Sequence, residues 1–198
     1  MSNRIARRWH VLASVVQHKH QAKVRGRVLD VGCGKMPYKR LFYGRPDSTV
    51  TEWVGLDVRP VGDVHANVTD MPFEDSSFDT VLCLDVLHLV TDPLSAMKEM
   101  GRVLKPGGTM IVCVVNTWID DAESIWNIKA NGLRWLVAEA GLHGEIEAMG
   151  DLFSGEAYEY EEWQKYREGI SLRGFVGALN KNYPLMSVAV VSKEQANG

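Results

Sequence analysis

The chain alternates between short apolar runs and longer stretches whose apolar residues recur at helical spacing. The helical spacing predicts helices over 3–18, 92–104 and 129–140. The apolar runs predict strands at 27–32, 52–58, 63–67, 78–85, 108–115, 144–149 and 185–192. Because strand and helix patterns follow one another in turn, we expect an α/β protein with a parallel sheet and helices on both faces.

The net charge and the cysteines argue against several classes of protein. A formal net charge of −3 disfavours a nucleic-acid-binding domain, which is normally basic. Cys33, Cys83 and Cys113 lack the spacing of a metal site or a disulfide framework, which favours reduced thiols in a cytoplasmic protein. No run reaches the roughly 18 apolar residues of a membrane span. We therefore expect no metal, no nucleic acid and no membrane span, and the sequence does not indicate an oligomeric state.

The first predicted strand runs into a Gly-x-Gly turn, Gly32-Cys33-Gly34. Glycines in this position allow the backbone to approach a ligand closely. Open α/β sheets bind their ligands beyond the carboxyl ends of the strands, where this turn lies. The motif by itself is shared by several nucleotide-binding families.

Three features narrow the choice of cofactor. Pro37 stands where a dinucleotide-binding loop has its third glycine, and the chain has no Gly-Lys-Ser/Thr of a phosphate-binding loop. Asp57 ends the second predicted strand, where a carboxylate can accept both hydroxyls of a ribose. The sequence thus favours a ribose-containing cofactor whose pyrophosphate, if it has one, is not held by this loop.

Five motifs follow one another over about residues 27–142: Val28–Gly34, Gly55–Asp57, Thr69–Phe73, Phe78–Val90 and Arg102–Gly108. Together they resemble the motifs of class I S-adenosylmethionine-dependent methyltransferases of the small single-domain type. Each string alone is common, but five of them in this order at this spacing are a strong signal for the family. The resemblance implies a Rossmann-like, doubly wound, seven-stranded sheet whose last strand, at 185–192, is antiparallel and lies between its neighbours.

The resemblance also implies which residues bind S-adenosyl-L-methionine, and S-adenosyl-L-homocysteine as product. In the family the glycine loop passes under the methionine part, the acid at 57 binds the ribose, and the loop around Asp70 holds the adenine. From the residues alone, Asp30 is either a buried structural acid or a contact to the methionine ammonium, and Asp85 faces either cofactor or acceptor. The implied cofactor-binding residues are Asp30, Gly32, Cys33, Gly34, Asp57, Val58, Asp70, Met71, Leu84 and Asp85.

We expect a single methyltransferase domain over 1–198. Its parts are a helical N-terminal segment (1–26), a cofactor-binding core (27–150), an inserted segment on the substrate side (151–183), and a last strand with the tail (184–198). The inserted segment is too short for a large recognition domain, and its aromatic content suits a flat or apolar small-molecule acceptor.

His88 is the candidate general base, because it follows the fourth predicted strand and an imidazole takes up a proton near neutral pH. Trp118, Trp126 and Tyr158 lie in the two segments that exceed what the fold needs, and Trp9 lies on the N-terminal helix. These four aromatics are candidate acceptor contacts. For each of them, a plain role in packing is the competing interpretation.

The leading functional prediction is methyl transfer to an oxygen or nitrogen of a small molecule. The fourth strand reads Leu84-Asp85-Val86-Leu87 and lacks the asparagine-proline-proline-aromatic motif typical of methylation of nucleobase or amide nitrogens. A second hypothesis is a methyltransferase-like protein that binds the cofactor without transferring a methyl group, as a regulatory partner or as the catalyst of another rearrangement. A nicotinamide-dependent dehydrogenase is a third alternative, disfavoured by Pro37.

Overall fold

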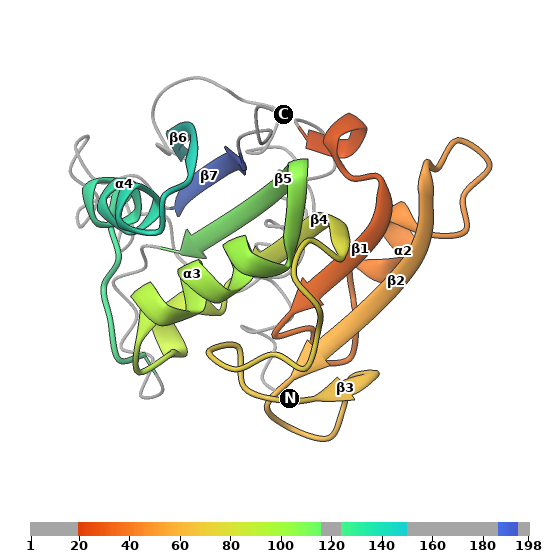
Figure 1. Cartoon of the computed structure of the whole chain (residues 1–198), viewed down its shortest axis with the longest axis horizontal. Coiled ribbons are helices and arrows are strands. Elements are labelled where there is room, and N and C mark those ends of the chain that lie inside the picture. Colours follow the sequence, from red (N-terminus) through yellow and green to blue (C-terminus); the bar gives the residue numbers. More distant parts are fainter. Residues whose placement is uncertain (1–19, 116–123, 150–185, 194–198) are drawn as a thin grey trace, which may run out of the picture.

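The computed structural model describes residues 20–115, 124–149 and 186–193. They form a seven-stranded sheet of order β3-β2-β1-β4-β5-β7-β6 (Figure 1). The strands are β1 (Gly26–Val31), β2 (Val50–Asp57), β3 (Val64–His65), β4 (Phe78–Leu84), β5 (Leu104–Val115), β6 (His143–Met149) and β7 (Met186–Ser192). The helices are α2 (Lys39–Phe42), α3 (Pro93–Val103) and α4 (Ala130–Glu139), with 3-10 turns η1 (Gln21–Lys23) and η2 (Leu87–Leu89).

The strand directions agree with the predicted fold class. Strands β1 to β5 pair in parallel, whereas β7 pairs antiparallel with both β5 and β6 and lies between them. The predicted α/β, Rossmann-like sheet with its antiparallel last strand is therefore confirmed. Since parallel strands share one direction, the carboxyl ends of β1, β2 and β4 meet at the same edge of the sheet.

The central strands are apolar throughout because both of their faces are covered. In β4, Val81 and Cys83 point into one hydrophobic cluster, and Leu82 and Leu84 into another on the opposite face. All four side chains are buried. This explains why the strand reads as a continuous apolar run instead of an alternating one.

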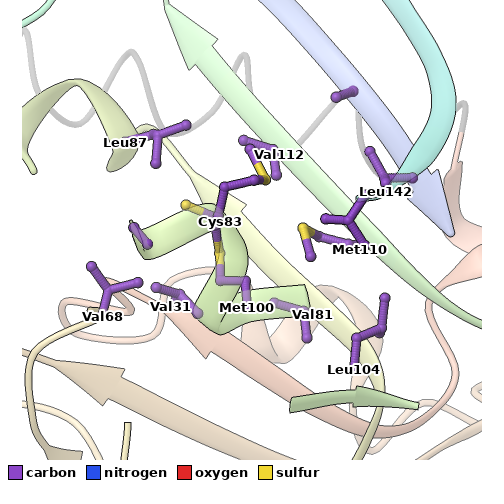
Figure 2. Close-up of a cluster of buried hydrophobic side chains, with 14 of the residues drawn as sticks. Val31, Val68, Val81, Cys83, Leu87, Met100, Leu104, Met110, Val112 and Leu142 are labelled. Atoms are coloured by element: carbon purple, nitrogen blue, oxygen red, sulfur yellow. The ribbon is translucent and has the colours of Figure 1, made fainter. Parts of the chain in front are cut away.

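The first cluster packs beneath α3 and α4. Figure 2 shows Met100 of α3 among side chains of the central strands, with Leu142 from the turn after α4 beside Met110 of β5. Helix α3 starts where the sequence predicts: Asp92 accepts a hydrogen bond from the Ser95 amide at 3.0 Å, and Pro93 is the first helical residue. The second cluster fills the other face, where Tyr38, Phe42 of α2 and Trp53 pack on the sheet.

Two elements differ from the prediction. Strand β5 begins at Leu104 and not at 108, because the Lys105-Pro106-Gly107-Gly108 stretch is an irregularity within the strand and not a turn before it. Leu104 pairs with Phe78, and pairing resumes at Thr109 with Thr80. The four-residue helix α2 was not predicted, since it is too short to show a helical period. The helix expected over 3–18 lies outside the described residues.

Candidate functional site

The glycine loop crosses the carboxyl end of β1. Gly32 and Gly34 have φ of 66° and 52°, in the left-handed region that favours glycine. The amides of Gly32 and Cys33 both donate to the Leu56 carbonyl, at 2.8 and 3.0 Å, which fixes the loop to β2. A Cβ at position 32 would collide with the side chain of Val86, so only glycine lets this loop pass so close to the segment after β4.

Asp30 is buried at the end of β1, 1% exposed, on the face that also holds Trp53. Its Oδ2 atom has no hydrogen-bond partner within the described residues. Burial raises the pKa of Asp30 to about 7; the Trp53 indole opposes this rise and the nearby Asp57 carboxylate adds to it. The buried, unpartnered Oδ2 atom suits a ligand that brings a cationic donor.

Asp57 lies at the carboxyl end of β2, and its side chain is 4% exposed. Oδ2 accepts from the Gly34 amide at 2.9 Å, and Oδ1 accepts from the Arg59 amide at 2.9 Å. The Arg59 guanidinium donates to both oxygens, at 3.0 and 3.2 Å. Burial alone would raise the pKa of Asp57, but these hydrogen bonds outweigh it and hold the pKa below its ordinary value.

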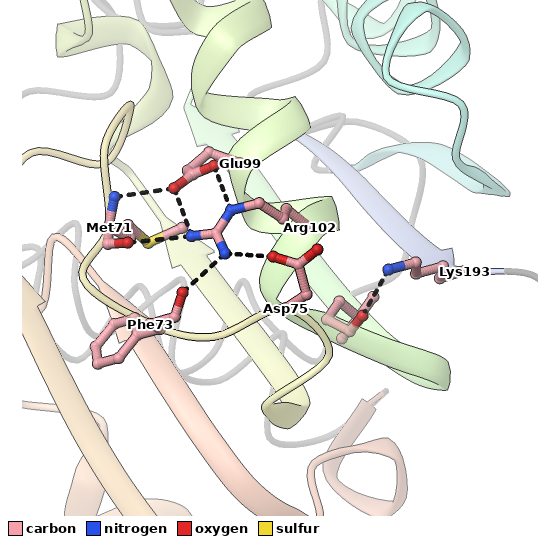
Figure 3. A network of polar contacts seen from close by, with 7 residues as sticks. Met71, Phe73, Asp75, Glu99, Arg102 and Lys193 are labelled. Carbon is pink, nitrogen blue, oxygen red and sulfur yellow. Dashed lines mark hydrogen bonds and ion pairs between the residues drawn. The ribbon is translucent and has the colours of Figure 1, made fainter.

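The loop with the predicted adenine contacts is fastened to α3 (Figure 3). Glu99 accepts from the Met71 amide at 2.9 Å, and Arg102 donates to the carbonyls of Met71 and Phe73 at 3.1 and 2.7 Å. Glu99 and Arg102 also pair with each other at 2.7 Å. Met71 is buried, whereas Asp70, just before it, is exposed.

Three further predicted residues lie at the same edge of the sheet. Val58 follows Asp57 and is 65% exposed. Leu84 ends β4 and is buried. Asp85 has a φ of 62°, rare for a residue with a side chain, and its amide donates to the Cys113 carbonyl at 2.9 Å.

His88 lies in η2, one turn beyond Asp85, and is 4% exposed. Its Nε2 atom lies 3.8 Å from Asp85 Oδ1. The amides of Ile125 and Trp126 donate to the His88 carbonyl at 2.9 and 3.1 Å, and the Trp126 indole donates to the Val90 carbonyl at 2.9 Å. The segment around Trp126 is thus attached beside the predicted base, and Trp126 itself is 46% exposed.

The other three predicted acceptor contacts, Trp9, Trp118 and Tyr158, lie outside the described residues. Sequence reasoning missed Arg59, Glu99 and Arg102. For the last two, a usable signal exists in their spacing of three on one helix turn. Arg59 carries no comparable signal, because its pairing with Asp57 depends on how the chain turns after β2.

Neither a metal site nor a membrane helix is found in the part of the chain that the structure describes. No three His, Cys, Asp or Glu side chains gather there as metal ligands. Across these same residues, no helix combines the length and the apolarity needed to cross a bilayer.

Comparison with known proteins agrees with the geometry. Residues 29–112 match the family model of a methyltransferase domain. A solved SAM-dependent methyltransferase from Archaeoglobus fulgidus superposes with a TM-score of 0.65 at 15% identity, over 94% of either chain. The [4+2]-cyclase SpnF superposes with a TM-score of 0.63 at 21% identity, over 93% of this chain and 80% of its own. At such identities both likenesses concern the fold.

These findings define the class of protein as far as the matched residues reach: residues 29–112 match a methyltransferase domain, and the chain has the fold of solved SAM-dependent methyltransferases. A demethylmenaquinone methyltransferase from Clavibacter sepedonicus is 46% identical over 54 residues, which are 27% of this chain and 22% of that protein. The chain therefore matches only about a fifth of that relative's length.

Proposed function

We propose that the protein transfers the methyl group of S-adenosyl-L-methionine to an oxygen or nitrogen of a small-molecule acceptor. The observation that carries the proposal is Asp57, a buried carboxylate joined to the Gly34 amide of the glycine loop at 2.9 Å. A carboxylate at the end of the second strand, beside such a loop, suits a ribose and would repel a phosphate. A cytoplasmic location is part of the proposal, supported by three buried free cysteines.

The residues present fit this cofactor. Gly32, Cys33 and Gly34 would pass under the methionine part, and Asp30 would meet its ammonium group with the unpartnered Oδ2 atom. Asp57 would accept the ribose hydroxyls. Contacts to the adenine and the remaining cofactor atoms would come from Val58, Asp70, Met71, Leu84 and Asp85. The cofactor, when bound, supplies a methyl group activated by a sulfonium.

The protein's own part in the reaction would be to orient the acceptor and to take its proton. Holding two reacting groups in line at about 3–3.5 Å can lower a barrier by several kcal/mol without a covalent intermediate. His88 Nε2 would accept the proton of a hydroxyl or ammonium group. Asp85, 3.8 Å away, would favour the charged imidazolium that results. Trp126 would border the acceptor, together with Trp9, Trp118 and Tyr158.

Calorimetric titration with S-adenosylhomocysteine, S-adenosylmethionine and NAD tests the cofactor part. We expect micromolar binding of the first two, none of NAD, and loss of binding in Asp57→Ala. Asp47→Ala is the matched control, because Asp47 also pairs with an arginine two residues away but is exposed. No binding of either cofactor form, or equal loss in both variants, would contradict the proposal.

A second candidate function is cofactor binding without methyl transfer. It is favoured by the superposition on a [4+2]-cyclase, a protein of this fold that is named for a cyclisation and not for methyl transfer. Incubation of the protein with methyl-labelled cofactor and a panel of phenols, amines and carboxylates separates the two. Formation of S-adenosylhomocysteine that depends on an acceptor and falls in His88→Gln supports methyl transfer. Binding without any acceptor-dependent turnover supports the second candidate.

A further inference from the structure

Asp57 uses all of its hydrogen-bonding capacity within the chain. A carboxylate has about four lone-pair positions. Oδ1 accepts from the amide and from Nε of Arg59, and Oδ2 accepts from the Gly34 amide and from a terminal nitrogen of Arg59. No position remains for a ribose hydroxyl in this arrangement.

The two kinds of donor differ in how easily they can leave. The amides of Gly34 and Arg59 belong to the glycine loop and to the turn after β2, so they are fixed by the fold. The Arg59 side chain is 67% exposed, and a long side chain at the surface can adopt many other conformations that move its guanidinium away from Asp57. A ligand hydroxyl can therefore replace only the two side-chain hydrogen bonds.

The guanidinium also extends over the glycine loop. A Cβ built at Gly34 would lie 3.8 Å from the terminal nitrogen of Arg59. The proposed cofactor would place its methionine part at the loop of Gly34 and its ribose at Asp57. The Arg59 side chain contacts Asp57 and lies close to Gly34, so it would occupy space that this cofactor needs.

We propose that Arg59 is a latch on the cofactor site: its side chain holds Asp57 in the empty protein and must swing away when a ribose enters. The inference rests on the proposed cofactor. Cofactor binding then includes the breaking of an ion pair that is exposed on one side. Such pairs contribute modestly to stability, so the latch lowers the affinity for the cofactor several-fold without abolishing binding.

The test is calorimetric titration of wild type, Arg59→Gln and Arg59→Lys with S-adenosylhomocysteine, which has no sulfonium charge to be repelled by an arginine. We expect Arg59→Gln to bind about three- to tenfold more tightly than wild type. Arg59→Lys should lie between them, because an ammonium cannot make the two-pronged pair. Arg45→Gln is the matched control, since Arg45 makes the same two-pronged contact with Asp47 on the surface, and its affinity should equal that of wild type.

Two additional measurements separate the latch from a general effect of charge. Raising the salt concentration should tighten binding to wild type relative to Arg59→Gln, because salt weakens the ion pair that competes with the ribose. Adenosine should gain affinity in Arg59→Gln, whereas 2′,3′-dideoxyadenosine, which lacks both hydroxyls, should gain none from the freed carboxylate.

The outcomes are distinguishable. If wild type binds S-adenosylhomocysteine and Arg59→Gln binds it equally well or more weakly, the latch is overturned and the proposed function stands. If Arg59→Gln binds and wild type does not, the result supports both the proposed function and the latch, and the latch is then stronger than expected. Absence of binding in all variants overturns the proposed function and the latch with it.

Discussion

At the scale of single residues, Asp30 and Asp57 lie on neighbouring strands, but their carboxyl groups favour opposite protonation states. Asp57 receives four hydrogen bonds, so the charged form is favoured despite burial. Asp30 is buried with an unpartnered oxygen, so its charged form is disfavoured until a donor arrives. Sequence patterns identify both acids but do not reveal this difference, which depends on where donors lie in space.

Asp30→Asn should change how stability depends on pH. With its pKa raised from 3.8 to about 7, Asp30 binds a proton in the folded chain that the unfolded chain has lost between these values. Stability of the empty protein therefore falls as the pH rises from about 4 to 7. The Asp30→Asn variant lacks this decline. At pH 8 its free energy of unfolding without cofactor should exceed that of wild type by up to about 4 kcal/mol, because the shift is about three pKa units and each is worth 1.36 kcal/mol. Urea unfolding at pH 5 and pH 8 measures the difference.

The control is Asp47→Asn. Asp47 is an exposed acid whose pKa lies below its ordinary value, so it is ionised in both folded and unfolded chains above pH 5. Its replacement should leave the change between pH 5 and pH 8 as in wild type. If Asp30→Asn and wild type lose stability equally over this interval, Asp30 is already charged in the empty protein at pH 5, which contradicts the raised pKa.

Among the elements, α3 does more than cover the sheet. Its Glu99 and Arg102 hold the loop that precedes β4 by three contacts to backbone groups of Met71 and Phe73, and Arg102 also pairs with Asp75 at 2.7 Å. Arg102 holds the pKa of Glu99 below its ordinary value, since it favours the charged carboxylate. The predicted adenine-binding loop is thus positioned by a helix that itself need not touch the cofactor.

Arg102→Leu should therefore weaken both the fold and the cofactor site. Loss of several charge-assisted hydrogen bonds, at a residue whose side chain is 31% exposed, should cost about 2 kcal/mol of the free energy of unfolding. Binding of S-adenosylhomocysteine should weaken as well, because Asp70 and Met71 lose their support. Urea unfolding and calorimetry measure the two effects.

Arg134→Leu on α4 provides the comparison for this variant. Arg134 donates to Asn131 and to the Ile146 carbonyl on the surface, far in sequence from the site motifs. Its replacement should cost less than about 0.5 kcal/mol and leave the affinity unchanged. Similar losses in both variants would mean that the Arg102 contacts have no special role.

The elements also show what the sequence can and cannot predict. Strands such as β4 were predictable because burial on both faces demands a continuous apolar run. The start of β5 was not, since Pro106 and two glycines are typical of a turn, and only the pairing of Leu104 with Phe78 makes them part of a strand. The positions of Asp57 and the glycine loop followed from their motifs, whereas Arg59 on Asp57 is a side-chain contact that no spacing rule predicts.

For the whole molecule, the cysteines report on opening of the fold. Cys83 and Cys113 are fully buried in β4 and β5, on opposite faces of the sheet, and Cys33 is 2% exposed in the glycine loop. Burial raises the pKa of Cys33 and Cys83 to about 12 and that of Cys113 well above its ordinary value. Since a thiol reagent needs an accessible thiolate, reaction at Cys83 and Cys113 requires the sheet to open.

Cofactor binding should slow the labelling of the buried cysteines throughout the sheet, and not only that of Cys33 next to the site. A ligand that binds only the folded chain at 100 times its dissociation constant stabilises it by about 2.7 kcal/mol, which reduces the open population about 100-fold. We expect labelling of Cys83 and Cys113 by a disulfide reagent to slow by about this factor with S-adenosylhomocysteine, and not at all in Asp57→Ala. Urea supplies the reference in which all cysteines react. Labelling of both residues that stays fast while calorimetry shows full occupancy would mean that the central strands open with the cofactor still bound, so that the site and the core of the sheet are not one cooperative unit.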